Sequence, residues 1–185
     1  MKSILYIVVI FFGLSFSEDK AVTKVATSAA NWLKIENGVR GISMGGSQVA
    51  SGRGMTGAHY NPASIAFLGG SEFFYSKSNY LADISHNTLA YGTRLSPTDY
   101  FGLHLFYLHS GDMKVTTEAK PDGTGETFKV TNLSLRLIYG RQLTDRLRIG
   151  GALKYIREDI FTAYMHSFVF DLGSNFDTGL YGFIL

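Results

Sequence analysis

The chain has 185 residues, no cysteine and a formal net charge of +2 at pH 7. The lack of cysteine excludes a disulfide scaffold, and the small net charge, with no run of basic residues, excludes an electrostatic case for nucleic acid as a partner. Glycine, phenylalanine and tyrosine are abundant, whereas proline is rare. This composition predicts an all-β protein.

Residues 1–17 have the pattern of a secretory signal peptide. A lysine follows the first methionine, residues 4–14 are mostly apolar, and residues 15–17 read Ser-Phe-Ser, a small-x-small cleavage pattern. The apolar run is shorter than the roughly 20 residues that a transmembrane helix needs. We therefore predict export and cleavage near Glu18, with an uncleaved amino-terminal anchor as the alternative.

Residues 18–70 form a glycine-rich segment that precedes the strand-like part of the chain. Residues 52–57, "GRGMTG", match the spacing of a dinucleotide-binding loop, but the chain then runs into Asn61-Pro62 and not into the helix that such a loop requires. We predict no nucleotide site and no cofactor. A close backbone approach or a positive φ explains the glycines better, with a flexible tether as the alternative.

Upstream of the glycines, apolar residues recur at roughly helical spacing. They predict a short amphipathic helix over 20–35. The apolar positions are Val22, Val25, Ala29 and Leu33.

From residue 71 onward, apolar and polar residues alternate with the period of a β-strand. In 131–140, Leu133, Leu135, Leu137 and Tyr139 share one face, and Asn132, Ser134, Arg136 and Gly140 share the other, with Ile138 as the exception. In 146–156, Leu147, Ile149, Leu153 and Tyr155 lie opposite Arg148, Gly150, Ala152 and Lys154. Seven strands are predicted, at 71–80, 85–95, 100–110, 131–140, 146–156, 166–173 and 177–185.

Two architectures fit such strands: a soluble sandwich with an apolar core, and a transmembrane barrel with its apolar face in lipid. The predicted connections favour the barrel, because tight turns at 96–99, 141–146 and 174–177 alternate with longer loops at 111–126 and 158–165. The connection at 81–84 is the exception, because it is short where a long one is expected. Aromatic residues near the strand ends on the apolar face also suit a membrane interface. They are Phe101, Tyr107, Tyr139 and Tyr155.

We predict no enzyme activity and no metal site. The chain shows no serine-centred elbow, no pair of catalytic carboxylates and no histidines four residues apart. His104 and His109 fall on opposite faces of one predicted strand, because their separation is odd. All five histidines are therefore interpreted as rim or lumen residues.

An ordered set of short motifs resembles the amino-terminal signature of the PorV/PorQ family of outer-membrane proteins, which belong with the FadL-like long-chain fatty-acid transporter barrels. The set covers residues 31–68, and its last member is the Asn-Pro-Ala turn, with Tyr60 in the aromatic position before it. One departure is the stretch 51–54, where the family often has acidic residues. The matching residues are Leu33-Lys34-Ile35, Gly38-Val39-Arg40, Met44-Gly45-Gly46 and Asn61-Pro62-Ala63.

This resemblance implies an antiparallel transmembrane β-barrel of about fourteen strands, with residues 18–70 as a plug inside the lumen and 71–185 as the first part of the wall. A seven-stranded chain would leave an unpaired edge, so we expect a truncated product that ends near strand seven. The implied plug and turn residues are Gly45, Gly46, Tyr60, Asn61, Pro62 and Ala63, and Ser134, Arg136 and Lys154 are candidates for the lumen-facing side.

The resemblance also implies a location in the outer membrane, in contact with its lipid. Two functions follow from it and stay open here. The first is a scaffold or shuttle in protein export across the outer membrane, with secretion-system components or exported cargo proteins as partners. The second is FadL-like passive transport of hydrophobic small molecules. A soluble exported β-domain that binds a ligand or partner is the third alternative.

Overall fold

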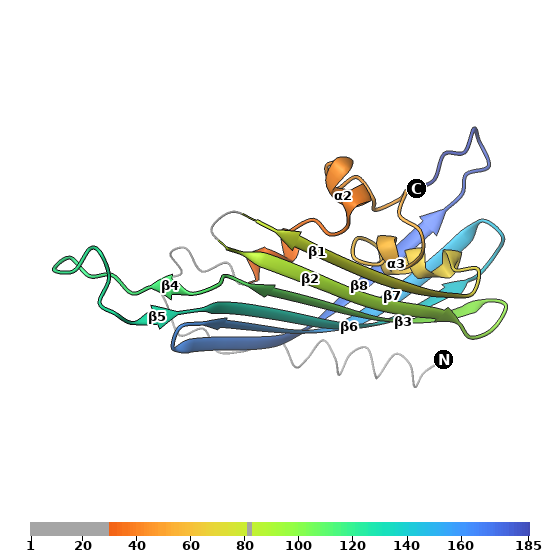
Figure 1. The fold of residues 1–185 in the computed structure, drawn as a ribbon. Helices are drawn as coiled ribbons and strands as arrows, with labels where there is room; N and C mark the ends of the chain where they lie inside the picture. Colours follow the sequence, from red (N-terminus) through yellow and green to blue (C-terminus); the bar gives the residue numbers. More distant parts are fainter. Residues whose placement is uncertain (1–29, 81–82) are drawn as a thin grey trace, which may run out of the picture.

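The computed structural model describes residues 30–80 and 83–185. The predicted signal peptide and most of the predicted helix at 20–35 lie outside these residues. The main element of the described chain is one antiparallel sheet with the strand order β1-β2-β3-β6-β7-β8 (Figure 1). Its strands are β1 (Ser71–Asn79), β2 (Ser85–Arg94), β3 (Asp99–His109), β6 (Val130–Gln142), β7 (Leu147–Ile160) and β8 (Ala163–Phe176).

A small second hairpin, β4 (Met113–Lys114) with β5 (Thr127–Phe128), lies between β3 and β6. It extends beyond one end of the main sheet (Figure 1). All strand neighbours in the main sheet follow one another in this order along the chain, so the sheet is a meander. No strand pairing joins β1 to β8 within the described ranges, and both are edge strands of an open sheet.

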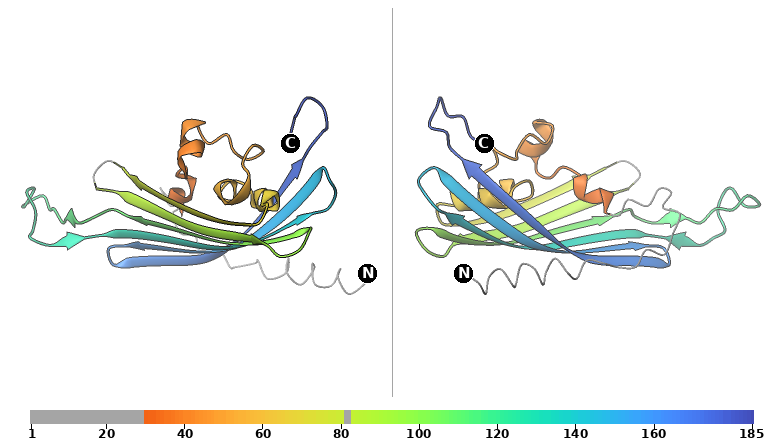
Figure 2. Two further views of the ribbon diagram at one scale, coloured as in Figure 1. Left: turned by 45° about the vertical axis from the view of Figure 1, so that its right-hand side comes forward. Right: turned by 180° about the vertical axis from the view of Figure 1, so that it is seen from behind.

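The N-terminal segment, residues 30–70, lies against one face of this sheet, and the sheet curls around it (Figure 2). The segment contains only short helical turns. None of the helices in the described part of the chain is long and apolar enough to span a membrane. The turns are η1 (Asn31–Lys34), α2 (Val39–Ser43), α3 (Gly54–Gly57) and η2 (Pro62–Phe67).

Side chains alternate along every strand between an inner face, which the N-terminal segment covers, and an outer face. On β6 the polar inner residues Ser134 and Arg136 are buried, whereas Leu135 and Leu137 on the outer face are 38% and 45% exposed. The predicted alternation of β6 and β7 is confirmed, but its polar face is the covered one. An apolar face open to the surroundings is the opposite of a soluble sandwich, in which the apolar face is the covered one.

The core lies between the N-terminal segment and the inner face. One apolar cluster joins Met55 and Ile65 of the segment to Ile138 of β6, and a second joins Trp32 of η1 to Phe106 of β3. Ile138, the exception to the alternation, is therefore an inner residue that packs on the segment. Burying a side chain such as Ile65, which is 0% exposed, stabilises the packing by about 1.5–3 kcal/mol.

The carboxyl-terminal part of the strand prediction needs correction. Residues 166–173 lie in the longer β8, but 177–185 is not a strand, because Gly179 and Gly182 adopt positive φ and form a turn there. The predicted turn at 174–177 lies mostly within β8. The predicted long loop at 158–165 is a tight turn between Ile160 and Ala163, so long and short connections do not alternate as predicted, and the main sheet has six strands.

Candidate functional site

A row of glycines crosses the inner face and forms the seat of the N-terminal segment. Gly92 pairs with Gly102, and Gly140 pairs with Gly150, which pairs with Gly173. A Cβ atom on Gly150 would lie 2.5 Å from the backbone nitrogen of Ala63, and one on Gly140 would lie 2.5 Å from Cγ2 of Ile65. These glycines leave room for η2 to contact the sheet backbone.

Asn61 fastens the start of η2 to the sheet. Its side-chain oxygen accepts a hydrogen bond from the backbone N–H of Ala63 at 2.9 Å, which is a helix N-cap. Its amide nitrogen donates to the carbonyl oxygens of Val49 at 2.8 Å and of Ser174 at 3.0 Å. One buried amide thus joins η2, the preceding loop and β8, and Pro62 supplies the fixed φ of the first helical position.

Asn61→Ala should lower the free energy of unfolding by about 2 kcal/mol, because an N-cap and two buried carbonyl partners are lost together. Asn61→Asp keeps the cap acceptor but turns a buried carboxylate oxygen toward the carbonyl oxygens of Val49 and Ser174, so a loss at least as large is expected. Denaturant unfolding of the chain in detergent measures both. Asn87→Ala, at a half-buried position on the outer face with a 3.5 Å contact to Tyr75, is the control and should change little. Equal losses for Asn61 and Asn87 would contradict this role of the cap.

The other predicted plug residues lie farther from the sheet. Gly45 and Gly46 both adopt positive φ, as predicted, but a Cβ on Gly45 would meet nothing within 4 Å. The hydroxyl group of Tyr60 donates to the carbonyl oxygen of Asn37 at 3.0 Å and holds the loop before α2. Burial raises the pKa of Tyr60 to about 12, with help from the carboxylate of Glu36. Tyr60 therefore stays a neutral hydrogen-bond donor.

Two buried cations on the inner face share one carboxylate. Oδ2 of Asp171 on β8 lies 3.3 Å from Nη2 of Arg136 and 3.0 Å from Nζ of Lys154. Nη1 of Arg136 also donates to the carbonyl oxygens of Ala58 at 2.6 Å and of His59 at 3.1 Å. Arg136 therefore ties β6 and β8 to the N-terminal segment, and the ionic cluster keeps one excess positive charge.

Histidine rings lie beside this cluster. The ring of His59 lies 5.6 Å from that of His104 on β3 and 6.0 Å from that of Phe106, measured between ring centroids. Burial, followed by the positive charges of Arg136 and Lys154, lowers the pKa of His59 from 6.5 to about 4. Nδ1 of His59 and both ring nitrogens of His86 are buried without a hydrogen-bond partner. The His59 ring is thus held in its neutral form.

The outer face carries two apolar rungs that cross the whole sheet. Each rung takes one residue from each of the six strands. The first rung is Tyr75, Leu89, Leu105, Leu135, Tyr155 and Phe168, and the second is Phe73, Tyr91, Leu103, Leu137, Leu153 and Phe170.

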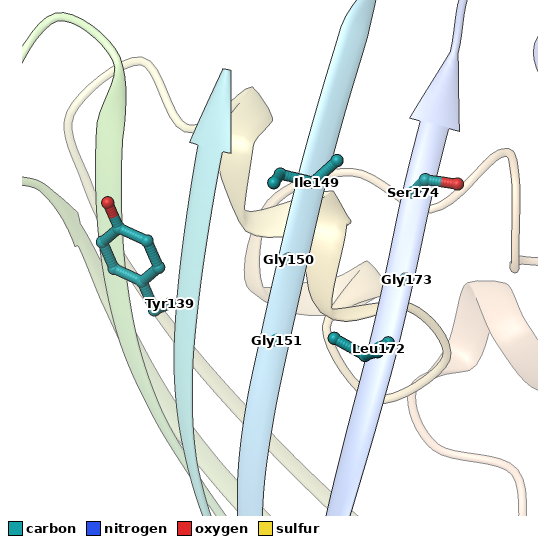
Figure 3. Close-up of a pocket in the computed structure, with 7 residues that line it drawn as sticks. All are labelled: Tyr139, Ile149, Gly150, Gly151, Leu172, Gly173 and Ser174. Atoms are coloured by element: carbon teal, nitrogen blue, oxygen red, sulfur yellow. The ribbon is translucent and has the colours of Figure 1, made fainter. Parts of the chain in front are cut away.

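Beside these rungs, Gly151 leaves a shallow apolar groove of about 480 Å³ on the outer face, between Tyr139, Ile149 and Leu172. Figure 3 shows this groove, with the N-terminal segment behind Gly150 and Gly173. The groove interrupts the apolar surface only locally. The rungs and the groove together present a continuous apolar exterior.

Sequence reasoning placed Ser134, Arg136 and Lys154 on the polar face, and the structure buries all three on the inner face. It missed the glycine row and Asp171. It also missed Asn175 on β8, whose buried amide accepts a hydrogen bond from Asn61 and donates one to the carbonyl oxygen of Ala50 at 3.1 Å. Each glycine of the row falls on the inner face by the two-residue period of its strand, so its face could have been predicted from the sequence. Which glycines lie side by side depends on the strand register. In residues 30–80 and 83–185, no three His, Asp or Glu side chains are grouped to hold a metal ion.

The sequence was also compared with known proteins. No protein-family model matches the chain. A search of the curated proteins finds no significant match either.

Proposed function

We propose that this chain forms part of the wall of an outer-membrane β-barrel of the PorV/PorQ type, with the N-terminal segment as a plug. The main support is the pattern of the two faces. The outer face exposes two complete apolar rungs, whereas the inner face carries charged and amide side chains beneath the segment. This is the arrangement that a strand wall between lipid and a polar interior requires.

A scaffold or shuttle role in protein export is the function we favour within this proposal. The N-terminal segment packs on the glycine row with no space for a Cβ atom, and Arg136 and Asn61 fasten it with buried polar contacts. A segment held in this way closes the inner face, which suits a scaffold better than a steadily open conduit. Passive transport of hydrophobic small molecules would require the segment to move.

Leu135→Arg separates the membrane wall from a soluble domain. In lipid, an arginine near the middle of the apolar band should impair assembly by about 2–4 kcal/mol, whereas in water the same change at a 38% exposed position should be tolerated. The assay is folding into lipid vesicles, followed by the heat-modifiable mobility of the folded chain.

Thr131→Arg is the matched control, because Thr131 lies on the same face of β6, beside His109 and Asp159 at the polar end of the strand. Its cost should be about 0–1 kcal/mol. Equal folding of both variants in vesicles, together with recovery of the wild type as a soluble monomer, would reject the membrane wall.

A further inference from the structure

The N-terminal segment is attached to the sheet by two unlike sets of contacts. Around η2 the contacts are apolar or made by amides, and Pro62, Ile65 and Asn61 lie on the glycine row without any titratable group among them. Met55 of α3 belongs to the same set, because it packs with Ile65 and lies on Gly92 and Gly102. Residues 30–37 are attached differently, through the stack of Trp32 on Phe106 and through the backbone of Ile35, which accepts a hydrogen bond from the ring of His59. Acid should therefore act on the two parts differently.

Every element packed around His59 brings charged or titratable groups toward it. Arg136 of β6 and Lys154 of β7 are the nearest cations, and Asp171 of β8 is already bonded to both of them. His104 of β3 and His86 of β2 add two more imidazoles. Within the segment, Tyr60 packs edge-on against the ring, and the backbone of Ile35 accepts a hydrogen bond from it.

We propose that His59 is a pH-sensitive latch: when its imidazole takes up a proton, residues 30–37 leave the inner face while α3 and η2 stay on the glycine row. A proton on His59 would place a third positive charge beside Arg136 and Lys154, with Asp171 as the single carboxylate bonded to that pair. Arg136 already contacts the carbonyl oxygen of His59 at 3.1 Å, and like charges repel strongly in a medium of low dielectric constant. Release of residues 30–37 admits water to the imidazole and relieves this repulsion.

The direction of the pH effect follows from the lowered pKa of His59. Since the folded state holds the imidazole neutral down to about pH 4, while the free side chain titrates at 6.5, the attached state binds fewer protons than the released state. Attachment is therefore strongest above pH 6.5. It weakens as the pH falls through the window between 6.5 and about 4.

Trp32 reports the release directly, because it is the single tryptophan of the chain and is buried against Phe106. As the chain in detergent micelles is taken from pH 7.5 to 4, its emission should shift to the red and quenching by acrylamide should rise, reversibly. His59→Gln should remove this transition. His166→Gln, a change at an exposed outer-face histidine beside Tyr164, is the matched control and should leave the transition as in the wild type.

A second variant keeps the proposal testable if His59→Gln does not fold. Lys154→Met removes one cation that lowers the pKa of His59, so the released state gains less from protonation and the transition should move to lower pH. An unmoved transition in this variant, or a wild-type transition that persists in His59→Gln, overturns the latch. The assay needs no bilayer, so its outcome is separate from that of the membrane wall.

Discussion

Gly150→Ala should detach η2 from the inner face and lower the free energy of unfolding by about 3 kcal/mol, at the upper end of the usual cost of overpacking. The added Cβ would lie 2.5 Å from the backbone of both Pro62 and Ala63, and a backbone atom cannot move aside as a side-chain end can. Detachment also exposes Ile65. Trypsin cleavage after Arg53, together with denaturant unfolding, measures the effect.

The neighbouring residue supplies the control. Gly151 lies one position along β7 on the outer face, where a Cβ would contact only the side chains of Phe170 and Leu172, at 3.6 Å or more. Neither glycine adopts a positive φ. Gly151→Ala should therefore leave stability and cleavage almost unchanged. If both variants lose the same stability and are cleaved to the same extent, the absence of a side chain at Gly150 is not what makes room for η2.

Arg136→Met should cost about 3–5 kcal/mol, which is typical when one partner of a buried ion pair is removed. The methionine keeps most of the volume but leaves the carbonyl oxygens of Ala58 and His59 without their donor. It also leaves Asp171 with Lys154 as its remaining cation. The loss should show as a lower denaturant midpoint for the red shift of Trp32, because the segment carries that tryptophan.

Arg157→Met is the matched control for Arg136→Met. Arg157 lies on β7 and pairs with Asp159 at 2.9 Å, but the side chain is 51% exposed. Pairs of this kind contribute between about 0 and 1 kcal/mol. A similar small loss in both variants would show that the N-terminal segment is held by apolar packing and the glycine row, without a large part for the ionic cluster.

The strands in the middle of the chain could be predicted because their two faces differ chemically. Leu133, Leu135 and Leu137 alternate with polar residues, and this pattern survives in β6. Strand ends could not be predicted in the same way. The charged run Arg157 to Asp159 is typical of a loop, yet β7 continues to Ile160. A strand that extends past an apolar band into water has charged residues on both faces and loses the alternation.

For the candidate site, the sequence predicted single residues better than their combination. The Asn-Pro turn and the positive φ of Gly45 and Gly46 follow from local chemistry, and all three are found. The convergence of Arg136, Lys154 and Asp171 requires the register of three strands. Because a shift of one residue moves every side chain to the other face, register must be known before such a cluster can be predicted.

The way the N-terminal segment is fastened also sets the order in which this molecule can fold. Each strand pairs with a strand close to it in sequence, so the sheet can grow hairpin by hairpin from the amino-terminal end. The segment precedes all of these strands, yet its hydrogen bonds join residues up to 128 positions apart, as from Ala30 to Glu158 and from Asn175 to Ala50. The first described part of the chain is therefore the last to reach its place. Until the strands beneath them have formed, Trp32 and Ile65 remain exposed and need protection from aggregation.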